Sequence, residues 1–139
     1  MKLVTLLLLG ATLAQAQESI FDCFAELPLP RYDYFAWHAQ LQGSGTVLFR
    51  IASAPSDSAP AMVVKASHDV LRLILVRSFA KTRVKACKHD SVLVSFQFEI
   101  REHRSEFPLH EVVFRSPATF IISVTRHPES AERSEGSRR

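Results

Sequence analysis

The chain has 139 residues, of which 47% are hydrophobic, so it indicates one domain with its own core and excludes a wholly disordered protein. Its formal net charge of +3 is mild, and by itself it indicates neither a nucleic-acid partner nor a membrane partner. The sequence contains no asparagine, which excludes N-glycosylation and removes the Asn-Gly signal for a hairpin.

Residues 1–16 have the pattern of a cleavable signal peptide. Lys2 gives a positive start, a short apolar run follows, and Ala14 and Ala16 form a small–any–small cleavage site. The apolar run is shorter than the about 20 residues that cross a bilayer, although an uncleaved anchor is the alternative. We therefore expect a secreted, extracellular protein without a membrane span.

The two cysteines, Cys23 and Cys87, form an even pair. In an oxidising compartment such a pair predicts one intrachain disulfide, which would stabilise the fold by roughly 4 kcal/mol. Two free thiols or intermolecular bridges are the alternatives.

The first strand is expected over residues 32–41, where apolar side chains recur at alternate positions. Gly43-Ser44-Gly45 follows and permits a tight turn, after which residues 46–53 alternate again. This pattern predicts a β-hairpin.

A short strand is expected over residues 62–66. Residues 70–76 are almost continuously apolar and contain Val, Ile and Leu, which favours a buried strand. A short helix capped by Ser67 or Asp69 is the alternative.

Residues 79–87 read as a strand that carries its cations on one face. An extended strip of cations could bind a sulfated glycan or anionic lipid head groups, and a solvated strand face is the plainer interpretation. The candidate polyanion-binding residues are Arg77, Lys81, Arg83, Lys85 and Lys88.

The clearest strand lies at residues 92–100, where Val and Phe occupy every second position and polar residues lie between most of them. Residues 109–114 also look strand-like, and residues 120–124 present the apolar face of a last strand. Aromatic residues on these faces are expected in the core, but some could line an apolar pocket. The candidates are Phe35, Trp37, Phe96 and Phe98.

This rhythm of short strands predicts an all-β fold, an antiparallel two-sheet β-sandwich of seven to nine strands, with a closed or partly open β-barrel as the alternative. The domain would span residues 17–127. Residues 128–139 contain no large apolar side chain and indicate a disordered polar tail.

No catalytic group is evident in the sequence. Ser67-His68-Asp69 and His89-Asp90-Ser91 resemble a triad in composition, but neighbours on an extended chain point to opposite faces. The six histidines are dispersed, and neither Gly43 nor Gly45 opens a phosphate-binding loop, because a strand follows. We expect no enzyme activity, no metal and no cofactor.

Five segments carry a resemblance to a known family, namely 34–39, 45–49, 92–100, 107–111 and 120–124. Their order resembles a galectin-like sandwich module of animal extracellular proteins, the farnesoic acid O-methyltransferase-type domain. The resemblance implies a sandwich over residues 32–125. It does not imply methyl transfer, because no cofactor motif is visible.

These features together predict a secreted, non-catalytic binding module that recognises an extracellular protein or glycan. A carrier of a small apolar ligand is the first alternative. A hydrolase whose site is assembled from dispersed residues is the second.

Overall fold

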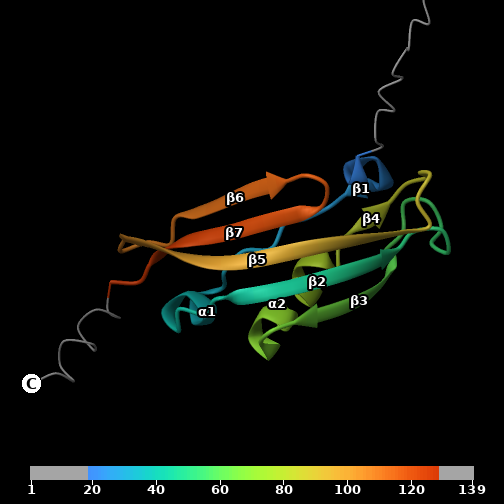
Figure 1. Ribbon diagram of the computed structural model, residues 1–139. Helices are drawn as coiled ribbons and strands as arrows, with labels where there is room; N and C mark the ends of the chain where they lie inside the picture. The colour runs from blue at the N-terminus through green and yellow to red at the C-terminus, as the bar shows by residue number, and fades with distance from the viewer. Residues whose placement is uncertain (1–18, 129–139) are drawn as a thin grey trace, which may run out of the picture.

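The computed structural model describes residues 19–128 (Figure 1). The predicted signal peptide and, apart from Pro128, the predicted polar tail lie outside these residues. The elements are η1 (Ile20–Cys23), β1 (Phe24–Glu26), α1 (Tyr34–His38), β2 (Gly43–Arg50), β3 (Ala61–Ala66), α2 (Asp69–Phe79), β4 (Arg83–Val84), β5 (Ser91–Arg104), β6 (His110–Arg115) and β7 (Thr119–Arg126).

The strands form two sheets, as the strand-rich pattern predicts. One sheet has five strands in the order β3-β2-β5-β7-β6, and the other pairs β1 with β4. The larger sheet is open, with β3 and β6 at its edges, so the closed barrel is wrong for the described residues. β5 and β7 are parallel, which corrects the all-antiparallel expectation. After β5 the chain forms the edge strand β6 and then reverses into β7. β7 therefore lies between β5 and β6 and runs in the same direction as β5 (Figure 1).

β5 confirms the strand predicted at residues 92–100. From Val92 to Ile100 its even-numbered residues are buried on the inner face of the five-stranded sheet, and most of the residues between them are exposed. Phe96 stacks on Phe120 of β7 with ring centres 5.6 Å apart, and Phe79 of α2 lies 5.3 Å from Phe96. The inner face is therefore a packed aromatic core under α2.

The strand favoured at residues 70–76 is wrong, because this segment belongs to α2. The helix buries Leu71, Ile74, Leu75 and Phe79, whose spacing of three and four places them on one face against the sheet. The residue before the helix, His68, is its N-cap and makes no side-chain cap bond, so neither Ser67 nor Asp69 caps it.

The strand predicted at residues 32–41 is also wrong. Asp33 caps the short helix α1 by accepting a hydrogen bond from the Ala36 amide at 2.7 Å. Alternate apolar residues do not face one side here, because helical turns bury Ala36 and Trp37 and leave Tyr34 exposed.

The predicted hairpin is therefore displaced along the chain. Residues 43–45 lie inside β2 and do not form the turn. The observed hairpin joins β2 to β3 through the loop at residues 51–60, in which Asp57 has a positive φ of 62°. The short strand predicted at residues 62–66 is confirmed as β3.

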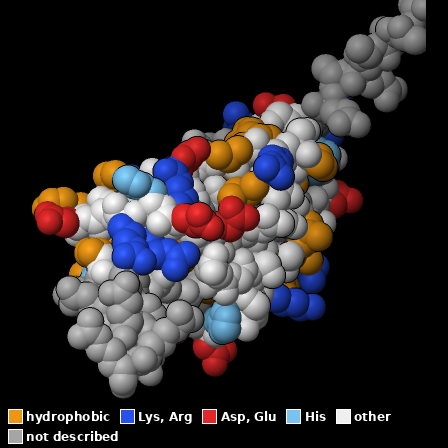
Figure 2. Space-filling view, turned by 60° about the vertical axis from the view of Figure 1, so that its left-hand side comes forward, with side chains coloured by type: hydrophobic (Ala, Val, Ile, Leu, Met, Phe, Trp, Pro, Cys, Tyr) orange, Lys and Arg blue, Asp and Glu red, His pale blue; other side chains and the backbone are white. Residues whose placement is uncertain are grey.

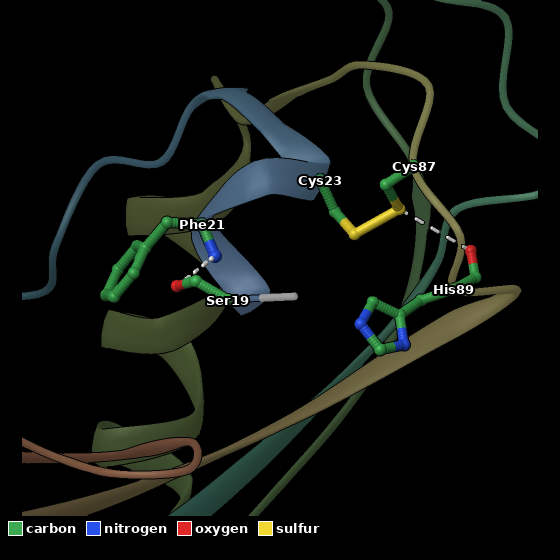
Figure 3. Close-up of a disulfide and its surroundings, with 5 residues drawn as sticks. All are labelled: Ser19, Phe21, Cys23, Cys87 and His89. Atoms are coloured by element: carbon green, nitrogen blue, oxygen red, sulfur yellow. Dashed lines mark hydrogen bonds between the residues drawn. A yellow bond between two sulfur atoms is a disulfide. The ribbon is translucent and has the colours of Figure 1, made fainter. Parts of the chain in front are cut away.

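The predicted disulfide is confirmed. Cys23 at the end of η1 is joined to Cys87, with Cα atoms 5.0 Å apart, and the Cys23 side chain is fully buried (Figure 3). The Lys85 amide donates to the Cys23 carbonyl at 2.9 Å, so a backbone hydrogen bond also joins the two segments that the disulfide links. A buried disulfide of this kind fits an oxidising compartment. Among residues 19–128, no helix has the length and apolar character needed to cross a bilayer.

Candidate functional site

Exposed apolar side chains gather along one edge of the larger sheet. Six of the twelve large apolar side chains that are exposed in the described chain lie at or beside β6. In Figure 2, apolar side chains reach the surface between charged ones. We call the following residues the β6 patch: Phe21, Phe107, Leu109, Val112, Val113 and Phe114.

β6 exposes both of its faces because it has a neighbour on one side only. Val112 lies opposite Ile122 of β7, and Phe114 lies opposite Phe120, so both point to the inner face of the sheet. Val113 points to the outer face, yet all three remain about 40% exposed. The ring of Phe21 in η1 lies 4.9 Å from Phe114 and extends the apolar surface on the inner face.

The free edge of β6 also presents backbone groups. The Thr125 amide of β7 donates to the Leu109 carbonyl at 3.2 Å, just before β6 begins. Because backbone groups alternate in direction along a strand, Glu111 and Val113 also direct theirs toward β7. The N–H and C=O groups of Val112 therefore face away from the sheet, as do those of the other even-numbered residues of β6.

Charged side chains flank Val113 on the outer face of β6. Glu111 forms an ion pair with Arg101 of β5, and Arg101 also donates to the Ser123 hydroxyl at 3.2 Å. Arg115 lies at the far end of β6, so Val113 sits between an acid and a base. The strand sequence HEVVFR contains neither Lys nor Pro, the residues that often protect a sheet edge.

The candidate polyanion residues are all exposed but do not share one strand. Strand β4 is much shorter than the predicted strand at residues 79–87, although the alternation around it holds, with Thr82 and Val84 buried. The Arg83 guanidinium lies 3.9 Å from the Asp57 carboxylate, and Arg83 lies opposite Glu26 of β1 in the strand register. Acids therefore lie among these cations. Lys81 and Lys85 flank Arg83, whereas Arg77 lies on α2 and Lys88 beyond the disulfide.

The candidate apolar pocket is divided between core and surface. Trp37, Phe96 and Phe98 are almost fully buried, whereas Phe35 is 64% exposed. The indole N–H of Trp37 donates to the Thr125 carbonyl at 2.6 Å. The three buried rings therefore fill space in the core.

Tyr32 lies beside this core, with its ring centre 5.6 Å from that of Phe98. Its hydroxyl donates to the Leu41 carbonyl at 2.7 Å. Burial raises the pKa of the Tyr32 hydroxyl well above its usual range, and the negative charge of Glu99 adds to the rise.

The triad-like sequences Ser67-His68-Asp69 and His89-Asp90-Ser91 lie at the starts of α2 and β5. The Ser67 hydroxyl accepts a hydrogen bond from the Ser44 amide, and His68 is the N-cap of α2. Residues 19–128 contain no group of three or more His, Cys, Asp or Glu side chains that could hold a metal ion. His38 contacts His127, with ring nitrogens 3.4 Å apart, a pairing that the sequence did not indicate.

The edge position of β6 was also missed, since sequence spacing does not tell which strand is last in a sheet. The available signal was Val112-Val113-Phe114, because consecutive apolar residues make both faces of a strand apolar.

No protein family, curated protein or solved structure matches the chain.

Proposed function

We propose that this chain is a secreted, non-catalytic binding module whose partner is an extracellular protein that docks along the β6 patch. The observation that carries the proposal is the concentration of exposed apolar side chains on a sheet edge that contains neither Lys nor Pro. Contiguous apolar surface and unpaired strand edges are typical of protein interaction sites. The signal-peptide pattern and the disulfide support the extracellular part.

The chemistry of the edge favours a protein over a glycan. An extended segment of a partner can pair with the outward backbone groups of β6, and its alternate side chains can cover Val112 and Phe114 on one face and Val113 on the other. A polyanion has less support, because Asp57 and Glu26 lie next to Arg83.

The same proposal includes the finer description of the fold as an unequal β-sandwich. Phe24 of β1 lies 5.0 Å from Phe49 of β2, ring centre to ring centre, and Val84 of β4 belongs to the same core. These contacts support two sheets that face each other beside α2, an arrangement that leaves the outer face of the larger sheet free for a partner.

The test uses Val113→Lys, which places a charge on the β6 patch while the backbone of residue 113 still faces β7. Val63→Lys on edge strand β3 is the matched control, because Val63 and Val113 are 41% and 39% exposed. Immobilised wild type and both variants are compared as baits for extracellular proteins of the source organism. We expect one protein to be retained by the wild type and by Val63→Lys but not by Val113→Lys. Equal retention on all three baits, or none on any, would contradict the proposal.

A further inference from the structure

We infer that the partner at the β6 patch is a second copy of this chain, with two β6 strands pairing antiparallel about a two-fold axis at Val113. This inference rests on the proposed function of the β6 edge as a docking site. It joins two five-stranded sheets into one continuous sheet, and a closed two-fold interface leaves neither β6 edge exposed.

The direction of the backbone groups permits this register. In an antiparallel pair, residues directly opposite each other point to the same face. With Val113 opposite Val113 of the second copy, Val112 of each copy lies opposite Phe114 of the other. Val112 and Phe114 are the residues whose N–H and C=O groups face away from β7, so they exchange the hydrogen bonds between the copies.

The side chains on both faces are complementary in the same register. On the outer face, Glu111 of each copy lies opposite Arg115 of the other, so that two opposite-charge pairs flank the central valines. On the inner face, Val112 lies opposite Phe114, a β-branched residue against an aromatic one. The charge pattern of β6 is therefore self-complementary when the strand is reversed.

A register centred on Val112 lacks this match. It places Glu111 opposite Val113 and His110 opposite Phe114, so the carboxylate faces an apolar side chain and no opposite charges meet. Both registers use the outward backbone groups of β6, and the opposite charges of Glu111 and Arg115 favour the register centred on Val113. Because a single pair of short strands buries little area, we expect a weak dimer whose population rises with concentration.

Charge reversal tests the register by sedimentation of the purified wild-type chain and its variants. Glu111→Arg and Arg115→Glu each set like charges opposite each other in a homodimer, and we expect each to weaken self-association by about tenfold or more. A mixture of the two variants restores opposite charges at both positions and should associate as the wild type does. A wild type that stays monomeric, or a mixture no better than the single variants, overturns the inference.

Disulfide trapping gives a second test that leaves the charges in place. Both native cysteines are joined to each other, so an introduced cysteine is the only free thiol. We expect Val113→Cys to form a covalent dimer on mild oxidation and the neighbouring Val112→Cys to remain monomeric. Linking through Val112→Cys alone overturns the register.

The two proposals can fail separately. Suppose the purified chain stays monomeric and Val113→Cys stays unlinked, while a different extracellular protein is still retained by the wild type and lost by Val113→Lys. The second copy is then wrong and the proposed function stands. If retention is also independent of Val113, both fail.

Discussion

Replacing Gly45 by alanine probes how closely α2 packs on the sheet. A Cβ atom at Gly45 would lie 2.6 Å from Cδ1 of Leu75 and 3.1 Å from the Lys65 carbonyl oxygen. Leu75 is fully buried, so its side chain cannot move into solvent. Added atoms in a packed core cost about 1–3 kcal/mol, whereas Gly→Ala gains about 0.4–1 kcal/mol from the unfolded chain. We therefore expect Gly45→Ala to lower the free energy of unfolding by about 1–2 kcal/mol.

The same substitution should behave differently when Leu75 is shortened. Leu75→Ala alone should cost about 2–5 kcal/mol, because it leaves a cavity. It also removes the nearer of the two atoms that a Cβ at position 45 would meet, so Gly45→Ala should cost less in that background than in the wild type. The two changes should therefore not add.

Urea unfolding followed by the fluorescence of the single tryptophan, the buried Trp37, measures all four proteins of this cycle. The signal reports on the core, and the midpoints convert to free energies if the slopes agree. Additive effects, or a stabilising Gly45→Ala in the wild-type background, would refute the close packing of α2 on β2.

Three further predictions concern stability. Replacing Cys23 and Cys87 together by serine should lower the free energy of unfolding by about 4 kcal/mol, measured with urea. Thr82→Val should raise it by about 1 kcal/mol, because the Thr82 hydroxyl is buried without a partner, whereas Thr125→Val should lower it by a similar amount because that hydroxyl is bonded. The folded chain retains the Tyr32 proton that the unfolded chain loses near pH 10.0, so melting temperature should fall as pH rises above that value, and less steeply in Tyr32→Phe.

Much of the fold was readable from side-chain periodicity. The two-residue rhythm of β5 placed Phe96 and Phe98 on the inner face, because a half-buried strand separates its apolar and polar residues cleanly. The disulfide was equally predictable from an even cysteine pair behind a signal-peptide pattern.

The two helices were missed for different reasons. α2 carries β-branched residues, and its run of Val70 to Val76 is apolar on more than one side, so β propensity favoured a strand while packing decided for a helix. In α1, the Asp33 cap and the core contacts of Trp37 outweigh the local alternation.

The candidate site depended on information that lies outside local sequence. Val112, Val113 and Phe114 could be placed on a strand, but their exposure follows from the position of β6 at the end of the sheet order. That order arises from long-range pairing between β5 and β7, which no local pattern encodes.

Amide hydrogen exchange of β6, followed residue by residue as the protein concentration is raised, tests the docking edge most directly. The amides of Glu111 and Val113 face β7 and should exchange slowly at every concentration, which makes them internal controls. The amides of Val112 and Phe114 should exchange quickly in dilute solution and slow down as copies pair. If these two amides remain fast at all concentrations and with every candidate partner, β6 is not a docking edge.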